Sequence, residues 1–482
     1  MATQVLSRRT TTRRPNGRDS VLMLASMIRD PLAVYLSIAA KYGDAVRIPL
    51  SPRTGLFMFS RPEHAEHVLA LNQDNYVKAF TYRPLRALIG NGLLTSEGEH
   101  WRRHRRLIQP LFTRRDARNF GPAMTEAASR MLKNWDDRPE GSQIDVGLQM
   151  SALALDIVGR ALFGSDLTGD AAAISRAMSA GQRVAVLATL VPLPWGPRST
   201  KALKAVARRA GNTPEGIEGP VGRMIADRRA LAAARQPASA TDDGAQAGGR
   251  MDLLDTLLTA RRDDGSPFTD TEIGDELATF MLAGHETSAV TLAWSLALLS
   301  AYPAARDRLE QEVDTVLAGR APEAADVDRL PWTTAVIAET MRLYPPAWTI
   351  ERDAIGDDNV AGVPVPAGST IAVPPYLIHR NPEFWPDPAG FDPARFLRPG
   401  EPGAAAAGGR VFAGERPRYA YIPFGGGRRA CVGQSFAELE TVLVLASIVQ
   451  RFRLDLTPLG IPKPIAAVTL RPGRLPMRLL RR

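Results

Sequence analysis

The sequence predicts a mainly helical fold with a small β-rich lobe. Ala, Leu and Met recur at helical spacing from residue 116 to about residue 235, and Thr269 to Ala301 forms the longest apolar helical pattern. Alternation between Ala45 and Ser60 predicts a pair of strands, and the segment from Val363 to Val373 predicts further short ones. Helical segments therefore dominate, and strands are confined to a few short stretches.

Composition narrows the class of protein. With 45% hydrophobic and 23% charged residues, the 482-residue chain has an ordinary globular composition. Its single cysteine excludes an intramolecular disulfide, so we expect a reducing compartment, the cytoplasm. The net charge of +9 is compatible with nucleic-acid binding. However, most arginines are spread along amphipathic helices and no zinc-finger or RNA-binding motif is present, so we expect no nucleic-acid partner.

The N-terminal segment predicts neither a signal peptide nor a membrane anchor. Residues 1–20 are basic and rich in Ser and Thr, which predicts a disordered tail. Val21 to Ile28 is apolar, but Arg29-Asp30-Pro31 follows without a small-residue cleavage site, so we expect a helix of the fold. The pair Arg8-Arg9 is followed by too polar a segment for a twin-arginine signal. No apolar run is long enough to span a bilayer.

The first part of the ordered chain predicts helix, strands and helix. Pro31 to Tyr42 reads as a helix ended by Gly43, and the strand pair turns at residues 51–53. Residues 61–71 return to helix. His64 and His67 are three apart there, which is not a metal signature, so we expect a solvated polar face.

A basic helix opens at Glu97. Trp101 and Arg105 are four residues apart and share one face of it. By itself this pattern is typical of a solvated basic helix.

Two other segments predict surface loops, and a third leaves two interpretations open. Residues 236–250 and 400–418 are low in complexity and read as flexible insertions. The break at 190–197 is apolar and rich in proline, which fits either a mobile lid or a packed loop.

The long helix contains polar residues in its middle. Burying a polar group is costly unless it is partnered or functional. Gly284 permits local widening, and the Thr287 hydroxyl is able to bond back to the helix and bend it. An ordinary kinked core helix is the alternative.

The stretch from Phe424 to Gly433 holds the only cysteine, Cys431. Three glycines precede it and an apolar helical pattern follows, so we expect Cys431 at a helix start, where the dipole favours a thiolate. Gly433 would leave a flat face beneath a planar partner, and Arg429 would pair with an acidic group on that partner.

Two other interpretations compete for this stretch. A lone cysteine is most often a small buried apolar residue. The spacing Gly425-x-Gly427-x-x-Ala430 also fits a relaxed dinucleotide loop, but only about fifty residues follow, too few for such a domain.

The pattern Phe-x-x-Gly-x-Arg-x-Cys-x-Gly resembles the heme-binding loop of the cytochrome P-450 family. Trp101/Arg105, the Ala283 to Ser288 segment and a Glu-x-x-Arg pair at Glu339 and Arg342 stand in the family's order. The resemblance covers the chain from about residue 21 to its end. It implies one domain over residues 21–482, with heme b between the long helix near Thr287 and the cysteine loop.

The resemblance also implies site roles. Cys431 would be the proximal iron ligand, in a loop that includes Phe424 and Gly433, and its thiolate favours O–O cleavage. Glu286 and Thr287 would deliver protons during oxygen activation, with His285 at a variable position. A Glu-Arg-Arg triad (Glu339, Arg342, Arg395) would fix the proximal loop. The heme propionates would be held by Trp101, Arg105, Arg352 and Arg429.

The reaction implied is insertion of one oxygen atom of O2 into a lipophilic substrate, usually by hydroxylation, of the kind found in secondary metabolism. Two electrons would come from a ferredoxin or flavodoxin and its reductase. This partner would dock on a basic proximal surface formed by Arg102, Arg103, Arg106 and Arg428. We expect a monomer of the soluble bacterial type without a membrane anchor.

Two alternatives to this function remain. A heme-thiolate binding or sensing protein would need no proton relay, so the Glu286-Thr287 pair disfavours it. A structural or DNA-associated basic protein would contain no heme.

The expected substrate-pocket residues are mostly apolar, which suits a terpene, fatty acid, steroid, polyketide or macrolide. They lie at residues 80–94, Phe280, Met281, Ala283, residues 347–350 and near Val468.

Overall fold

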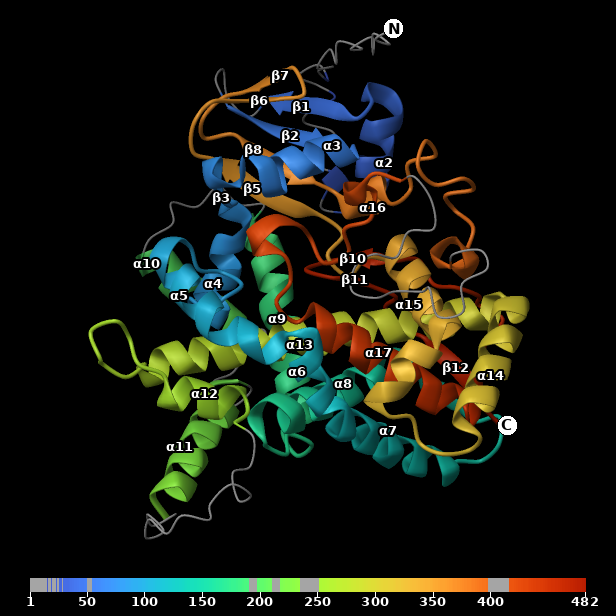
Figure 1. Ribbon diagram of the computed structural model, residues 1–482. Coiled ribbons are helices and arrows are strands. Elements are labelled where there is room, and N and C mark those ends of the chain that lie inside the picture. The colour runs from blue at the N-terminus through green and yellow to red at the C-terminus, as the bar shows by residue number, and fades with distance from the viewer. Residues whose placement is uncertain are drawn as a thin grey trace, which may run out of the picture.

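The chain is mainly helical, with a small β lobe at one end (Figure 1). A computed structural model describes residues 29–49, 54–189, 197–209, 217–234, 251–397 and 416–482, with a few positions before residue 29. The predicted fold class is therefore confirmed. The predicted tail at 1–20 and the loops at 190–196, 236–250 and 400–415 lie almost wholly outside the described residues.

The helices of the described residues run from the β lobe through the helical body. They are α2 (Pro31–Tyr42), α3 (Pro62–Glu66), α4 (Arg83–Ile89), α5 (Gly98–Ile108), α6 (Arg114–Ala117), α7 (Gly121–Asp136), α8 (Val146–Phe163), α9 (Ala171–Thr189), α10 (Pro197–Arg209), α11 (Glu218–Ala234), α12 (Leu253–Thr259), α13 (Asp270–Ala301), α14 (Pro303–Leu317), α15 (Pro331–Leu343), α16 (Pro375–Ile378) and α17 (Gln434–Val449).

The β lobe is a five-stranded sheet with the order β1-β2-β8-β5-β3. These strands are β1 (Ala45–Pro49), β2 (Gly55–Phe59), β3 (Tyr76–Lys78), β5 (Ile350–Ala354) and β8 (Thr370–Val373). Strands far apart in sequence pair here, and the register places Lys78 directly opposite Arg352. Like charges in that position are destabilising unless an anion compensates them.

Three smaller sheets complete the β structure. They are β6 (Asp358–Val360) with β7 (Val363–Val365), β10 (Ile465–Ala466) with β11 (Leu470–Arg471), and β4 (Gln143–Asp145), β12 (Pro476–Arg481) and β9 (Phe452–Leu456) in the order β4-β12-β9. The strands predicted at 45–60 are β1 and β2, and those predicted at 363–373 are β7 and β8. The C-terminal strands were not predicted, although β10 pairs with β11 and β9 pairs with β12 over short separations; only the pairing of β12 with β4 is long-range.

The helix predicted at 61–71 is α-helical only to Glu66 and continues as the π-helical turn His67–Leu71. The expected solvated face is wrong for His64, which is 1% exposed. Its ring lies 5.1 Å from that of Phe59, and burial lowers its pKa to about 4. His67 is half-buried and bonds to Asp358 at 2.9 Å. These histidines therefore belong to the packing of the β lobe.

Helix α13 crosses the helical body, packed along α8 (Figure 1). A capping box starts it: the Thr269 hydroxyl accepts from the Glu272 amide, and the Glu272 carboxylate accepts from the Thr269 amide. The helix is α-helical from Asp270 to Ala301, so the expected widening at Gly284 does not interrupt it. A Cβ at Gly284 would lie 3.0 Å from the Val158 side chain, so this glycine serves close packing against α8.

One described helix, α8, is by itself long and apolar enough to cross a membrane, and 67% of it is buried inside the protein. The α13–α14 pair passes the same test only as a span bent by 112°.

The expected Glu-Arg-Arg triad is present at the end of α15. Glu339 is fully buried and receives two bonds from Arg342, at 2.6 and 2.7 Å. Arg395 Nε lies 3.3 Å from the same carboxylate. The Tyr421 hydroxyl donates to the Ala338 carbonyl of α15 at 2.9 Å, which ties the cysteine loop's approach to this helix.

Candidate active site

The cysteine loop is a tight turn just before α17. The Cys431 amide donates to the Phe424 carbonyl at 2.9 Å, closing the loop. Gly427 has a φ of +63°, and a Cβ there would meet the Leu69 carbonyl at 1.7 Å, so only glycine fits. Helix α17 begins at Gln434, with Gly433 as its N-cap. Cys431 therefore lies just before the start of α17, three residues ahead of Gln434.

The expected thiolate is not favoured by the protein alone. Cys431 is exposed by surface area, yet the protein around it raises the pKa of its thiol by desolvation. The Gly433 amide and the Arg105 charge oppose this and lower the pKa, but they do not outweigh it. An iron ion at the sulfur would favour the thiolate, because a metal ion deprotonates a coordinating thiol.

Helix α13 presents one stripe toward α5 and α17. Glu276, Phe280, Ala283 and Thr287 follow each other at spacings of four, three and four, so they share a face. Phe112 stacks on Phe280 at 5.4 Å. Ala283 is exposed although most of the helix around it is buried. An open space therefore adjoins α13 at Ala283 and Thr287.

Two links between α13 and α17 flank this space. Phe112 lies 6.1 Å from Phe436 of α17 as well as against Phe280 of α13. On the other side, the Ser288 hydroxyl donates to Glu440 of α17 at 2.5 Å. The middle of α13 is thus held opposite the start of α17, near the cysteine loop.

The Thr287 hydroxyl donates to the Ala283 carbonyl at 2.5 Å, as expected for a back-bonded threonine. Its oxygen lone pairs remain able to accept from a group in the open space. His285, on another face, is buried against Ser151 of α8 at 2.7 Å, and burial lowers its pKa to about 4. His285 is therefore neutral and lies apart from Thr287.

Glu286 connects α13 to two other segments. Its carboxylate accepts from Thr469 Oγ1 at 2.7 Å and from the Gln182 side-chain amide of α9. Burial raises the pKa of Glu286, while these two bonds lower it in part. A carboxyl group with a raised pKa holds a proton to a higher pH than an ordinary one, which suits a group that accepts and releases protons.

A group of cations, of which Arg352 is buried and Lys78 and Arg429 are half-buried, lies where the β lobe meets the helical body. Lys78, Arg352 and Arg429 repel one another, and the pKa of Lys78 falls well below its usual value, first through burial and then through the two arginines. Burial likewise lowers the pKa of Arg429 to about 10. Glu97 pairs with Arg429 and, among the described residues, is the carboxylate that acts on Lys78. Lys78 and Arg429 thus share one carboxylate, with Arg352 beside them.

Trp101 belongs to the same group, because the Arg429 guanidinium lies 3.9 Å from its ring centroid. Arg105, its neighbour on α5, does not. Arg105 donates to the Ala430 carbonyl at 2.9 Å and to Gln109 at 3.0 Å, and Cys431 is its electrostatic neighbour. Arg105 therefore braces the cysteine loop.

Lys78 was not predicted from the sequence. It ends a three-residue strand, and only its pairing with Arg352 brings it to the site. No local motif marks it, since the signal lies in long-range strand register.

A heme fits this set of groups. Its two propionates would supply the anionic charge that Lys78, Arg352 and Arg429 lack. A Cβ at Gly433 would have nothing within 4 Å, so space exists beside the cysteine loop for a flat group. Cys431 is the one thiol able to ligate iron.

Apolar side chains of α4, α9 and α13 line a small cavity of about 20 Å³. From the region expected at 80–94, Leu85, Leu88 and Ile89 contribute to it. Phe280 and Met281, also expected there, are instead buried in the core. The lining residues not foreseen from the sequence include Ala177, Met178, Gln182, Ile217, Ala278 and Leu282.

Of the four arginines expected on one surface, three are exposed and Arg103 is not. Arg102 and Arg106 are exposed on α5, and Arg102 pairs with Glu99 at 2.8 Å. Arg428 pairs with Asp74 nearby, since both line a pocket with Arg102. Arg103 is half-buried with its Nε inside the protein, so it does not belong to this surface.

Comparisons with known proteins agree with the site. A family model described as cytochrome P-450 matches residues 20–475. A Mycobacterium tuberculosis relative that is named as a member of this family is 36% identical over 425 residues, 86% of this chain and 85% of the relative. The pentalenene oxygenase of Streptomyces avermitilis is 34% identical over 463 residues, 95% and 94% of the two chains. The cyclooctat-9-en-7-ol 5-monooxygenase of Streptomyces melanosporofaciens is 34% identical over 440 residues, 89% and 86%.

The link between α13 and α17 depends on a buried acid. Glu440 is fully buried, and burial raises its pKa to about 8. The hydrogen bond from Ser288 has the opposite, smaller effect. At neutral pH the group is therefore mostly protonated and uncharged.

We expect Glu440→Gln to flatten the pH dependence of stability. The folded-state pKa of about 8 lies above the ordinary 4.5, so the stability that Glu440 contributes is complete below pH 4.5 and is lost as pH rises to 8. Glutamine does not titrate. Between pH 5 and 8, the free energy of unfolding of the variant should fall by about 2–4 kcal/mol less than that of the wild type. Denaturant titration at each pH measures this difference.

The matched control is Glu126→Gln, an exposed position on α7. Its pH profile should follow that of the wild type. A Glu440→Gln profile parallel to the wild type would mean that Glu440 is ionised in the folded protein.

Proposed function

The chain belongs to the cytochrome P-450 family and is a heme-thiolate monooxygenase, and we propose that it oxidises an apolar alkene-like substrate at Cys431 and Thr287. The family's activity requires redox partner proteins, O2 and a lipophilic substrate. The observation that best supports the site assignment is that α13, where Ala283 is exposed, is linked through Ser288 and Phe112 to α17, the helix that follows the exposed Cys431.

We assign the cofactor contacts to named residues. Heme, when bound, supplies the iron that activates oxygen. Cys431 would ligate it, with its loop closed by Phe424 and its face left open by Gly433. The propionates would lie at Trp101, Arg352, Arg429 and Lys78, and Arg105 would support the loop from Ala430.

In the proposed relay, Glu286 holds a proton and Thr287 passes protons into the open space. The raised pKa of Glu286 and the free lone pairs of the Thr287 oxygen support these roles. A protein that only binds or senses through heme would need neither group.

The proposed substrate is an alkene with few oxygen atoms. Two relatives are named for pentalenene and cyclooctat-9-en-7-ol, and both names denote alkenes. The cavity between α4, α9 and α13 has a volume of only about 20 Å³, too small for such a molecule, so it supports the proposal only through the chemistry of its Leu, Ile, Met and Ala walls, with Gln182 as its polar member. Apolar walls with few polar groups are typical of sites for such molecules.

We further propose one domain over residues 21–482, functioning as a monomer in the cytoplasm. The family model's match to residues 20–475 supports the first point, and the single cysteine supports a reducing compartment.

The first test is the absorption spectrum of the reduced protein with carbon monoxide. We expect the far-shifted Soret band of a thiolate-ligated heme, and its loss in Cys431→Ala. Heme bound without that band in the wild type would remove Cys431 as the ligand, and a protein without heme would overturn the proposal.

The second test concerns the proton relay. Thr287→Ala removes the hydroxyl beside the open space, so electrons should be consumed as before while product falls, by about tenfold or more per electron. The measurement is product formed per NADPH consumed. Thr315→Ala is the control, because the exposed Thr315 hydroxyl bonds back to the Gln311 carbonyl within helix α14, away from the site. Unchanged coupling in Thr287→Ala would remove the relay role.

The third test concerns the electron donor, which we propose to be an acidic ferredoxin or flavodoxin docking at Arg102, Arg106 and Arg428. Arg106 is exposed and has no ion pair within the described part of the chain. Arg106→Glu should raise the apparent KM for the donor about 5–10-fold at low salt, with the difference vanishing at high salt.

Arg308→Glu is the control for docking, because this exposed arginine lies on α14, at the opposite end of the molecule from α5 (Figure 1). Equal donor KM values for wild type and Arg106→Glu at every salt concentration would place docking elsewhere.

A further inference from the structure

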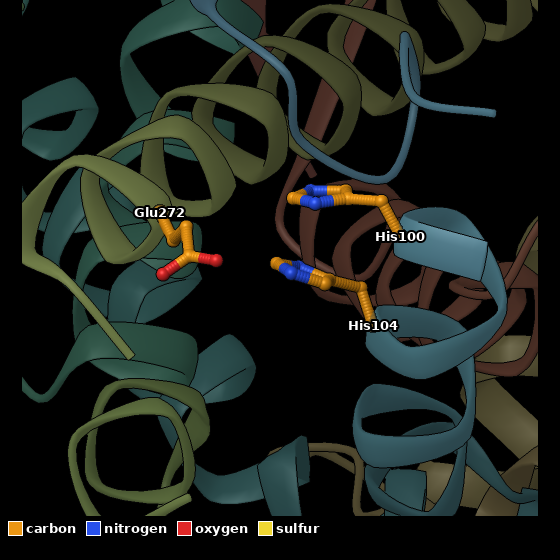
Figure 2. A group of neighbouring side chains, drawn as sticks. All are labelled: His100, His104 and Glu272. Carbon is orange, nitrogen blue, oxygen red and sulfur yellow. The ribbon is translucent and has the colours of Figure 1, made fainter. Parts of the chain in front are cut away.

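A cluster of side chains suited to metal binding lies between α5 and α13, apart from the cysteine loop (Figure 2). His100 and His104 are one helical turn apart on α5, and Glu272 is in the first turn of α13. One potential ligand atom from each residue lies within 4.8 Å of the others. We propose that these three side chains form a site for a divalent first-row metal ion, best suited to zinc.

His104 is prepared for this role by a buried carboxylate. Its Nδ1 lies 2.6 Å from Glu276 Oε1, and both side chains are fully buried. Because a carboxylate oxygen accepts, Nδ1 carries the hydrogen and Nε2 keeps its lone pair. Nε2 is buried and has no hydrogen-bond partner among the described residues. A carboxylate behind a ligating histidine is the usual support of a metal site.

His100 is oriented in the same way by a different acceptor. Its Nε2 lies 2.9 Å from the Asn91 carbonyl oxygen, which can only accept. Nδ1 is therefore the nitrogen with the free lone pair. The two rings stack with centroids 4.1 Å apart, and Figure 2 shows both directed toward the Glu272 carboxylate.

Glu272 offers one free carboxylate oxygen. The hydrogen bonds it receives from Arg262 and from Thr269 all end on Oε2. These bonds keep the pKa of Glu272 below its ordinary value against the opposing effect of burial. Oε1 therefore keeps its lone pairs for a metal.

Two imidazoles and one carboxylate are a typical zinc donor set, with a water as the fourth ligand. Zinc bonds of about 2.0–2.2 Å place neighbouring ligand atoms roughly 3.3 Å apart, so side-chain rotations of about 1 Å would close the site. Glu272 and Glu276 together balance the charge of a divalent ion. Calcium and magnesium prefer all-oxygen ligands and fit less well.

The position of the site gives it a structural role. Trp101 and Arg105 lie on α5 among these histidines and contact the cysteine-loop region. A zinc ion joining α5 to the start of α13 would hold this helix in place. The site does not depend on the proposed substrate or electron donor.

The test uses the heme-loaded protein, stripped with EDTA and dialysed against micromolar zinc chloride. We expect one zinc per chain by elemental analysis, with only nitrogen and oxygen neighbours in its X-ray absorption spectrum. His100→Gln should lose this zinc. Glu276→Gln should lower the zinc affinity about 10–100-fold, as for other residues behind metal ligands.

His67→Gln is the matched control, because this half-buried histidine lies outside the cluster and should leave the stoichiometry unchanged. Three results would overturn the site: no zinc retained by the wild type, a sulfur neighbour in the spectrum, or zinc retained equally by His100→Gln and Glu272→Gln. The wild-type spectrum decides the point even if a variant fails to fold.

Discussion

The concentration of buried positive charge around Lys78, Arg352 and Arg429 is the constraint on which the site depends. These residues come from β3, β5 and the cysteine loop, and Trp101 adds α5. Burial and the charges of the two arginines lower the pKa of Lys78, and burial lowers the pKa of Arg429, although Glu97 opposes both effects. A bound dianion would relieve this repulsion and thereby draw the β lobe and the helical body together. Cofactor binding and the packing of the two parts are therefore coupled through charge.

Helix α13 carries buried carboxyl groups, whose charge is opposite to that of the Lys78 group. Glu276 is satisfied by His104 of α5, and Glu286 by Thr469 and Gln182. Ser288 reaches an acid on α17, Glu440, on yet another face. Leaving a buried polar group unpaired costs about 1–3 kcal/mol, so a rotation or a shift of α13 would break several such bonds at once. The position of Thr287 is determined by these neighbours as much as by its own bond.

The site was predictable from the sequence where chemistry is local. The loop from Phe424 to Gly433, the Thr287 bond to Ala283 and the Glu339–Arg342 pair all act within a few residues. Lys78 was missed because its role depends on register across the sheet. The solvated face expected at His64 was wrong because packing against Phe59 cannot be read from a three-residue spacing. For Cys431, the surrounding fold raises the pKa of the thiol by desolvation against the local effects that favour the anion, and this effect cannot be read from the loop sequence.

The same distinction explains why a histidine pair at i, i+4 was not recognised as metal-binding. Spacing alone places His100 and His104 on one face of α5, which is equally typical of a solvated helix. The surroundings of the two rings change this interpretation. Asn91 accepts a hydrogen bond from one nitrogen of His100, Glu276 accepts one from His104, and Glu272 faces the pair from another helix. Those three acceptors come from segments separated by up to 172 residues from α5. A donor set of this kind is specified by the tertiary fold, because acceptors brought together by packing decide which nitrogen of each ring keeps its lone pair.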